Sequence, residues 1–435
     1  KNYSQLLRLN QVHATVVTGG LQRDNSCLTR LVKLSSSLGY PLYSIPVVCR
    51  APNPDTLLFN VLISSLVNTT NSHHSRLALY LYNRILLVGL RPDPYSFSLV
   101  LKAVLNLSVI TTYGRRFHAQ SIRMGLQFQN DVASSLFRMY SSSSIHLPDC
   151  RIFFESLSEG QRSRTIWNLM IFSYAKFGYG DEARLLFDTM PQRNVMSWTA
   201  VINGYILIGK PQEAISMFRS MLKDDRVEVD EVAILAAISA SAKLGSRCLG
   251  RWIHSYLHIR GVHCVITLHN ALIDMYAKSG DVETARRVFE SMECKTVVTW
   301  TTMIAGYANH GLAEEAHTLF KRLQRDGVKP NRVTFIALLS ACSRAGMVRV
   351  GREIFDDMWL RYGIEPTIEH YGCMIDLLGR SGYLQEAEDL LRCMPCEANA
   401  AIWGSLLAAS KTFKDAKRCE MALHHLTELE PHHSC

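Results

Sequence analysis

The sequence lacks an apolar run of the roughly 18 residues that a membrane-spanning helix needs, so we expect no membrane contact. It also lacks the alternation of apolar and polar residues that is typical of β-strands, and no Gly/Ser-rich or Pro-rich linker divides it. Its cysteines do not follow the spacing of small disulfide-bonded domains, which indicates reduced thiols. These absences favour a continuous all-α chain.

Signatures of catalysis and of metal binding are missing as well. A zinc-dependent cytidine deaminase needs a His-x-Glu and a Cys-x-x-Cys, but no histidine here is followed by Glu two positions later. The Cys-x-x-Cys that begins at Cys393 has no matching pair, and the spacing of His424, His425, His432 and His433 is too irregular for a zinc finger. No Gly-rich phosphate loop or nucleophile motif occurs. The sequence therefore predicts no catalytic residue, metal or cofactor.

The residues that are present indicate a folded, core-rich and mildly basic chain. Of its 435 residues 48% are hydrophobic, and 47 Lys and Arg exceed 38 Asp and Glu to give a net charge of +9. A single core rarely reaches this size, whereas a repeat array can. The positive charge suits a polyanionic partner without requiring one.

Residues 297–331 predict a pair of amphipathic helices, and they read VVTWTTMIAGYANHGLAEEAHTLFKRLQRDGVKPN. Thr299 is placed to cap the first helix, and Gly311 supplies the left-handed residue that ends it. The apolar stripe of the first helix is Trp300, Met303, Ile304 and Tyr307. The second helix ends at Gly327, and its stripe is Leu312, Ala316, Leu319, Phe320 and Leu323. Such a hairpin cannot bury both stripes alone, so copies must stack.

Copies of this hairpin follow one another along the chain with a period of roughly 35 residues. Residues 1–24 correspond to the second half of a unit, whose helix ends at Gly19 and Gly20. Residues 25–55 form a degenerate unit that prolines shorten. The further units are 56–93, 94–129, 130–163, 164–194, 195–230, 231–265, 266–296, 297–331, 332–367 and 368–399, and a final hairpin begins at residue 400.

Several phrases resemble those of pentatricopeptide repeat proteins. VVTWTTMIAGY places its aromatic residue fourth, unlike the tetratricopeptide pattern, and MYAKSGDVETARRVF, GRWIHSY, IEHYGCMIDLLGRSGYLQEAEDLL and AIWGSLLAAS match phrases of the plant PLS subfamily. The resemblance implies an all-α fold, a right-handed α-solenoid of stacked helix-turn-helix repeats. It also implies a PLS-type array at residues 1–399, of about 12 hairpins with the first one partial, and the first E motif at residues 400–435.

In this family a repeat binds one base of single-stranded RNA through the fifth residue of its first helix and the last residue of the repeat. Short polar side chains suit this task because they hydrogen-bond to Watson–Crick edges. The resemblance implies six such pairs: Thr29 with Asp55 for G, Asn60 with Asp93 for U, Asn168 with Asn194 for C, Thr199 with Asp230 for G, Asn270 with Thr296 for a pyrimidine, and Thr301 with Asn331 for A. In the unit 368–399, Gly372 leaves Asn399 to act alone.

Other interpretations of these residues need no ligand. Ser, Thr, Asn and Asp often cap helices, and the helical spacing of Trp167, Trp198 and Trp300 indicates core positions rather than platforms for bases. His370 is expected at the edge of the core or exposed. Basic clusters such as Lys321 with Arg322 are expected to be solvated faces that together help to hold phosphates.

The resemblance implies a site-recognition factor for C-to-U editing of organellar transcripts, in the mitochondrion or alternatively the chloroplast. The sequence matches neither a second E motif nor a DYW deaminase domain, so a DYW-type deaminase or other editing factors would act in trans. Two alternatives stay open: an organellar RNA stabilisation, processing or splicing factor, and a helical scaffold for protein partners. Steep dependence of binding on salt would distinguish RNA from protein ligands.

Overall fold

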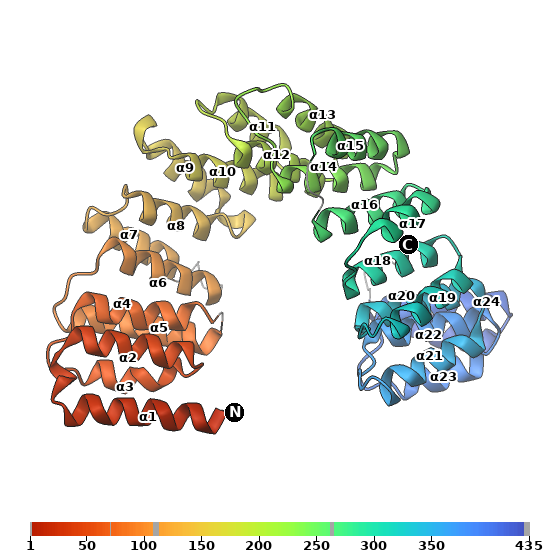
Figure 1. Cartoon of the computed structure of the whole chain (residues 1–435), viewed down its shortest axis with the longest axis horizontal. Helices are drawn as coiled ribbons and strands as arrows, with labels where there is room; N and C mark the ends of the chain where they lie inside the picture. Colours follow the sequence, from red (N-terminus) through yellow and green to blue (C-terminus); the bar gives the residue numbers. More distant parts are fainter. Residues whose placement is uncertain (1, 70, 108–112, 262–264, 430–435) are drawn as a thin grey trace. The chain divides into compact units, whose positions relative to one another are not determined.

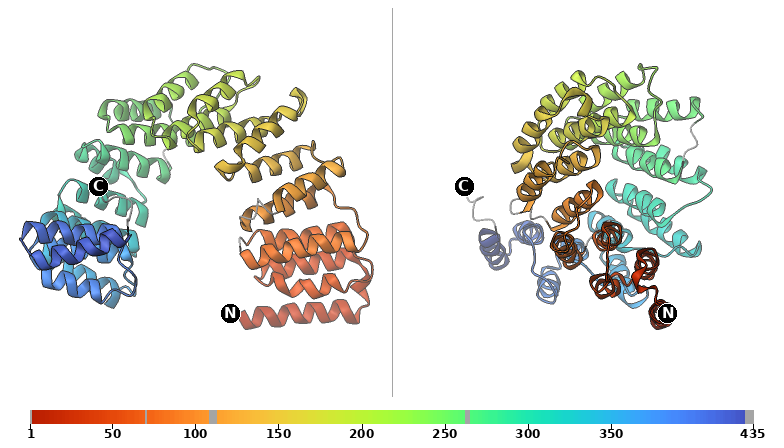
Figure 2. Two further views of the ribbon diagram at one scale, coloured as in Figure 1. Left: turned by 180° about the vertical axis from the view of Figure 1, so that it is seen from behind. Right: turned by 90° about the vertical axis from the view of Figure 1, so that its left-hand side faces the viewer.

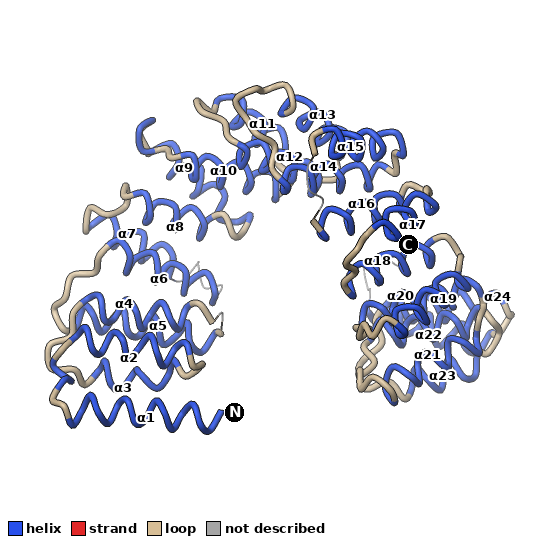
Figure 3. The backbone as a smooth tube through the Cα atoms, in the orientation of Figure 1, coloured by secondary structure: helices blue, strands red, loops and turns tan. Residues whose placement is uncertain are grey.

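A computed structural model describes residues 2–69, 71–107, 113–261 and 265–429, with side chains from residue 5 onward. Every regular element in these ranges is helical, and they contain no strand (Figure 1, Figure 3). The helices form two compact bodies, Lys1–Gly209 and Lys210–Cys435, here called the N-terminal and the C-terminal body. None of the described helices is long and apolar enough to cross a membrane. The predicted all-α class of stacked helical hairpins is confirmed.

The N-terminal body alternates first and second helices of successive repeats. Its first helices are α2 (Asn25–Ser37), α4 (Thr56–Val67), α6 (Pro94–Leu107), α8 (Asn130–Tyr140), α10 (Arg164–Lys176) and α12 (Val195–Leu207). Its second helices are α1 (Asn2–Thr18), α3 (Ser44–Cys49), α5 (Ser72–Leu87), α7 (Arg115–Arg123), α9 (Leu147–Ser156) and α11 (Gly180–Thr189). Short 3-10 turns are η1 (Leu21–Arg23), η2 (Pro41–Tyr43), η4 (Ser144–His146) and η5 (Glu159–Gln161).

The C-terminal body continues the same alternation. Its first helices are α14 (Glu231–Leu244), α16 (Ile266–Lys278), α18 (Val297–Asn309), α20 (Arg332–Ala345), α22 (Ile368–Arg380) and α24 (Ala400–Thr412). Its second helices are α13 (Pro211–Met221), α15 (Arg247–Ile259), α17 (Val282–Ser291), α19 (Ala313–Arg325), α21 (Val348–Leu360), α23 (Leu384–Arg392) and α25 (Ala416–Leu429).

The unit boundaries expected from the sequence coincide with the starts of the first helices, from Asn25 to Ala400. The stripes of the unit 297–331 are buried apart from Leu312, and Gly311 adopts a φ of +72° just after α18. The expected cap of α18 at Thr299 is wrong. Thr296 is the N-cap, while Thr299 is the third helical residue and completes a capping box, because the helix begins before Thr299 rather than after it.

Aromatic pairs join consecutive repeats. The fourth residue of a first helix packs edge-on against an aromatic residue of the preceding second helix, with ring centroids 4.7 Å apart for Trp198 and Phe187 and 5.0 Å for Trp300 and Phe289. The same arrangement joins Phe97 with Tyr82, Trp167 with Phe154, and Phe335 with Phe320. Trp167, Trp198 and Trp300 are all buried, so their predicted place in the core is confirmed.

The first helices of neighbouring repeats pack directly against one another within each body, and Figure 2 shows these stacked helices from behind and from the side. Small residues allow the close approach. A Cβ atom built on Gly306 of α18 would lie 3.0 Å from the Cβ of Ala277 in α16, and one on Gly379 of α22 would lie 2.9 Å from the Cβ of Ala409 in α24. These contacts lie in the C-terminal halves of the first helices, and they let neighbouring first helices pack closely within the body.

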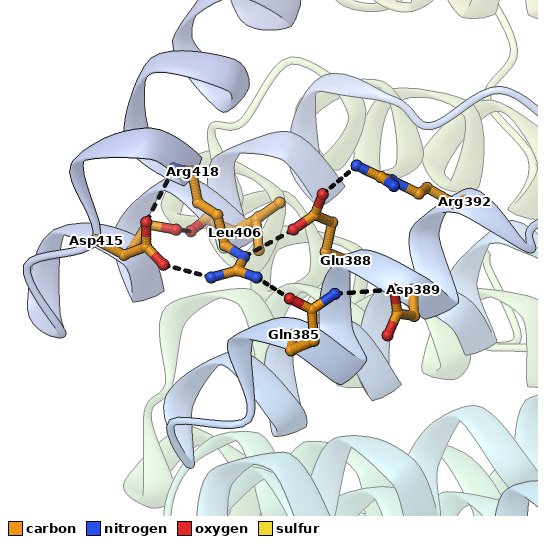
Figure 4. Close-up of polar contacts among 8 residues, drawn as sticks. Gln385, Glu388, Asp389, Arg392, Leu406, Asp415 and Arg418 are labelled. Carbon is orange, nitrogen blue, oxygen red and sulfur yellow. Dashed lines mark hydrogen bonds and ion pairs between the residues drawn. The ribbon is translucent and has the colours of Figure 1, made fainter.

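Arg418 holds the final hairpin, α24 and α25, to the preceding repeat (Figure 4). Its Nε donates to Oε2 of Glu388 at 2.8 Å, and its other guanidinium nitrogens donate to Asp415 and Gln385. Hydrogen bonds from the backbone and side chain of Arg418 lower the pKa of Asp415. Up to residue 429 this hairpin packs on α22 and α23 as a further repeat would; residues 430–435 of the expected E motif lie outside the described residues.

Candidate nucleic-acid interface

The last residue of each predicted pair caps the first helix of the next repeat. Side-chain oxygens of Asn194, Asp230 and Asn331 accept hydrogen bonds from the backbone N–H of the third helical residue at 3.0, 2.8 and 3.0 Å. The other residues with this role are Asp55, Asp93, Thr296 and Asn399. The capping interpretation is correct for these residues, but a cap engages only one of the two polar groups on an Asn or Asp side chain.

Asn60 and Asp93 meet directly across a repeat boundary in the N-terminal body. The Nδ2 of Asn60 donates to both carboxylate oxygens of Asp93, each at 3.1 Å. The hydroxyl of Ser96, the third residue of α6, lies 2.7 Å from Oδ1 of Asn60 and 2.9 Å from Oδ1 of Asp93, so these two acceptors share its single proton. Asn60 is only 1% exposed while Asp93 is exposed, so an approaching ligand would meet Asp93 first.

Thr301 and Asn331 are joined through a third residue in the C-terminal body. The hydroxyl of Thr301 lies 2.7 Å from the hydroxyl of Thr334, which donates to Oδ1 of Asn331 at 3.0 Å. Thr334 is fully buried and Thr301 is 7% exposed, whereas Asn331 is half-buried. Two side chains thirty positions apart in the sequence thus belong to one hydrogen-bonded chain.

Asn168 and Asn270 occupy the fifth position but leave a polar atom without a partner. Their amide oxygens are buried and accept no hydrogen bond from the described residues. Leaving a buried acceptor unsatisfied costs about 1–3 kcal/mol. At the boundary that follows Asn168, the hydroxyl of Ser197 instead donates to Oδ1 of Asn194 at 2.8 Å.

Thr199 and Asp230 belong to different bodies. Within the N-terminal body the hydroxyl of Thr199 donates to the carbonyl oxygen of Val195 at 2.8 Å, and within the C-terminal body Asp230 caps α14. For Thr29 and Asp55, the third residue of α4 is Leu58, which offers no hydroxyl. A hydroxyl bridge to the last residue is therefore not possible for the pair of Thr29 and Asp55.

An open pocket of about 440 Å³ lies where Gly372 replaces a fifth side chain. Gly372 and Asn399 both line it, together with side chains of α20, α22 and α24 such as Ser340, Arg344 and Ser405. Asn399 is exposed, and its Oδ1 accepts from the N–H of Ile402 at 3.1 Å. At this boundary a ligand has direct access to the last residue.

The sequence interpretation missed a row of exposed apolar side chains at the second position of the first helices. They are Leu57, Tyr95, Met196, Val232, Val298 and Val333, and each is 52% to 61% exposed. A single exposed apolar residue is ordinary on a protein surface, but core packing does not account for its recurrence at one repeat position. Aligning the repeats on their fifth residues would have revealed the row.

A basic residue also recurs at the thirteenth position of several first helices. These residues are Lys176, Lys243, Lys278, Arg344 and Arg380, and all are exposed. Favourable interaction with the carboxyl end of the helix dipole is one reason for their place. Positions two and thirteen are eleven residues apart, about three turns, so both lie on the same face of the helix. That face therefore combines apolar and basic side chains.

His370 is buried, which corrects the expectation that it lies at the core edge or exposed. It is the third residue of α22, and its Nε2 donates to the carbonyl oxygen of Arg332 at 3.0 Å. Its Nδ1 accepts from the backbone N–H of Thr367 at 3.1 Å, so the ring serves in the capping box. Burial lowers the pKa of His370.

Three side chains of the kind that bind metals meet on α25. The Nδ1 atoms of His424 and His425 lie 3.7 and 3.4 Å from Oε2 of Glu428, and the ring of His425 stacks on Trp403 with centroids 4.2 Å apart. Surface ion pairing is sufficient to account for this group. His432 and His433 lie outside the described residues.

Comparison with known proteins identifies the repeats. A model of the PPR repeat matches residues 165–195, 196–225, 267–297, 333–361 and 369–397, and a model of the PPR repeat family matches residues 295–344. A pentatricopeptide repeat-containing protein of Arabidopsis thaliana is 43% identical over 99% of this chain and 81% of its own length. From the same plant, one relative named as mitochondrial is 34% identical over 82% of this chain and 52% of its own length. Another, named as chloroplastic, is 31% identical over 97% of this chain and 59% of its own length.

A solved structure shares the fold. The crystal structure of the maize pentatricopeptide repeat protein PPR10 matches with a TM-score of 0.59 and 15% identity, over 92% of this chain and 63% of that one. A second structure of PPR10, in complex with an 18-nucleotide psaJ RNA element, matches with a TM-score of 0.47 and 15% identity, over 93% of this chain and 69% of that one. The relative that is 43% identical along almost the whole chain, together with the repeat matches, shows that the chain belongs to the pentatricopeptide repeat family.

Proposed function

We propose that the chain binds single-stranded RNA along the starts of its first helices, with one nucleotide at each repeat boundary. The observation that carries this proposal is that the fifth and last residues share one hydrogen-bonded site at two repeat boundaries, where Asn60 meets Asp93 and where Thr301 is joined to Asn331 through Thr334. Short polar groups held in this way suit the Watson–Crick edge of a base.

The rest of the same helix face supports the proposal. Apolar side chains such as Val298 and Val333 in successive repeats can pack on the faces of a base, which are apolar whatever its identity. Exposed basic residues such as Lys278 and Arg344 can hold phosphates, and the net charge of +9 attracts a polyanion. The first helices therefore offer apolar side chains for the faces of a base, short polar side chains for its edge and basic side chains for the phosphates.

We further propose that the chain is a PLS-type site-recognition factor for C-to-U editing of organellar transcripts, with an array at residues 1–399 and the first E motif from residue 400. A DYW-type deaminase in trans would act on the selected cytidine. The phrases of the PLS subfamily support this finer assignment. Relatives carry names of both organelles, and we place the chain in the mitochondrion, with the chloroplast as the alternative.

A binding titration at several salt concentrations tests the proposed RNA binding. The purified chain should bind a single-stranded oligoribonucleotide with an affinity that falls steeply as salt increases, and it should bind the corresponding duplex weakly. Failure to bind single-stranded RNA at low salt would leave the protein scaffold as the better account. Sequencing organellar cDNA from a plant without the protein then distinguishes the RNA roles: an editing factor changes specific cytidines, whereas a stabilisation or processing factor changes transcript ends.

A further inference from the structure

The third residue of a first helix is a buried polar group at several repeat boundaries. Ser96, Ser197, Thr299 and Thr334 occupy this position, and each is fully buried. Core packing does not require a hydroxyl there, because Leu58, Ala233, Leu268 and Ile402 fill the equivalent position in other repeats. Buried hydroxyl groups are retained where they are hydrogen-bonded, so the partners of these four indicate their role.

The partners of Thr334 fix the direction of every hydrogen bond in its chain. Oδ1 of Asn331 can only accept, so the single hydroxyl proton of Thr334 points to it at 3.0 Å. Thr334 must then accept from Thr301, whose hydroxyl is 2.7 Å away. The backbone N–H of Thr334 also donates to Oδ1 of Asn331 at 3.0 Å, which prevents the amide from turning over.

This directional chain leaves a defined pattern for a ligand. Thr301 has given its proton to Thr334, so its oxygen offers only lone pairs, while Asn331 is left with the N–H groups of its Nδ2. One acceptor beside one donor complements adenine, whose Watson–Crick edge carries an amino donor and a ring-nitrogen acceptor. Guanine presents a keto acceptor and a ring N–H donor, which is the opposite order.

The boundary at Ser96 has the opposite polarity. Oδ1 of Asn60 accepts from Ser96 at 2.7 Å and is therefore turned inward, so the amide presents Nδ2 toward Asp93. The carboxylate of Asp93 can only accept. Asp93 is the exposed member of the pair, so this boundary offers the base a carboxylate acceptor, which complements the ring N–H of uracil.

We propose that, where the third residue of a first helix carries a hydroxyl that links the fifth and last residues, as Ser96 and Thr334 do, it is a specificity-determining positioning residue, because its hydroxyl sets which groups of those two residues face the base. This inference rests on the proposed binding of single-stranded RNA. It names a third residue of the reading sites at Ser96 and Thr334, beyond the two that meet the base edge.

Thr334→Val tests the inference because valine keeps the shape of threonine and removes the hydroxyl. Affinities are measured for two oligoribonucleotides that differ only in A or G at the nucleotide assigned to repeat 297–331. The wild-type chain should prefer A. The variant should lose most of that preference, by roughly tenfold, because the hydroxyl of Thr301 can then donate as well as accept.

Two further variants separate positioning from a general loss of structure. Thr334→Ser restores the hydroxyl and should restore the preference for A. Thr412→Val removes a hydroxyl that donates to the carbonyl oxygen of Ala408 in α24, and it should leave the preference unchanged. If the effect of Thr334→Val were purely structural, the affinities for the A and the G oligoribonucleotide would fall by the same factor and their ratio would be retained. That result would overturn the inference.

The outcomes also distinguish the inference from the proposed function. A wild-type chain that binds RNA and prefers A, with a Thr334→Val variant that keeps this preference, refutes the role of the third residue and leaves RNA binding intact. A wild-type chain that binds no single-stranded RNA refutes both. Loss of the preference in Thr334→Val with recovery in Thr334→Ser supports both.

Discussion

A Cβ atom built on Gly204 in α12 would lie 2.1 Å from the Cβ of Ala175 in α10. The two first helices therefore approach so closely that one of them has no room for even a methyl group. The equivalent contact recurs at Gly306 with Ala277, where the separation would be 3.0 Å. Small residues thus set how closely the first helices of neighbouring repeats can pack within each body.

Gly204→Ala should destabilise the N-terminal body because the added methyl overlaps Ala175. Overpacking of this kind costs about 1–3 kcal/mol in the free energy of unfolding, which thermal or chemical denaturation measures. Gly372→Ala is the matched control, since its Cβ would lie 3.5 Å from Cγ1 of Ile402, an ordinary contact. The free energy of unfolding of that control should rise by up to about 1 kcal/mol, because alanine has a higher helix propensity than glycine. Equal effects of the two substitutions would contradict this account of helix spacing.

Tyr95→Ala should weaken RNA binding by roughly tenfold, because stacking on an aromatic side chain contributes about 1–3 kcal/mol per base. The loss should be similar for every base at that position, since each base has an aromatic face. Tyr80→Ala is the control: Tyr80 is 53% exposed on the second helix α5, while Tyr95 is 52% exposed on the first helix α6. If Tyr80→Ala weakened binding as much as Tyr95→Ala, the RNA would not follow the first helices.

The buried imidazole of His370 should make the C-terminal body less stable in mild acid than at neutral pH. Burial lowers the pKa of His370 in the folded chain, so below its ordinary value of about 6.5 the unfolded chain takes up a proton first. The free energy of unfolding should therefore fall as the pH drops through 6.5, until the lower folded pKa is passed. Protonation at Nδ1 would also remove the acceptor for the N–H of Thr367.

Melting temperatures of the wild type and His370→Thr at pH 7.5 and 5.5 check this expectation. Threonine retains a side-chain oxygen for the cap, as Thr334 does at the equivalent place in α20. The decrease from pH 7.5 to 5.5 should be smaller in the variant. An identical decrease in both proteins would assign the effect to other groups.

Arg418→Ala should loosen the final hairpin. The carboxylate of Glu388 is only 10% exposed and would lose its bond from Nε, and hydrogen bonds to charged groups contribute about 1.5–3 kcal/mol. Faster hydrogen exchange in α24 and α25 would report the change. Arg349→Ala removes an arginine that is 89% exposed and pairs with Glu353, so it should have almost no effect. Unchanged exchange in Arg418→Ala would show that apolar packing alone holds the hairpin.

The sequence determined the repeats well because their signals are local. Apolar stripes, polar caps and terminal glycines recur in each unit, and the first helices begin where the unit boundaries were expected, as at Val297 and Arg332. The cap of α18 was misplaced by one turn because Thr296 and Thr299 are both good caps, and only the backbone geometry distinguishes them.

The candidate site was predictable only in part. The family resemblance gave the fifth and last residues, but the bridge through Thr334 depends on the packing of α18 against α20, which a single repeat does not reveal. Burial of His370 likewise depends on a carbonyl group from the preceding first helix. Side-chain contacts between repeats could therefore not be predicted from the sequence.

The most direct test is to exchange one cap for another at residue 331. Asp also caps helices, so Asn331→Asp should leave the fold intact while its second carboxylate oxygen replaces the N–H groups of the amide. Thr301 and Asp would then present two acceptors, which suit the two N–H donors of guanine. We predict that the preference at this nucleotide changes from A in the wild type to G in the variant. An unchanged preference, in a variant that melts as the wild type does, would contradict the proposal that these residues select the base.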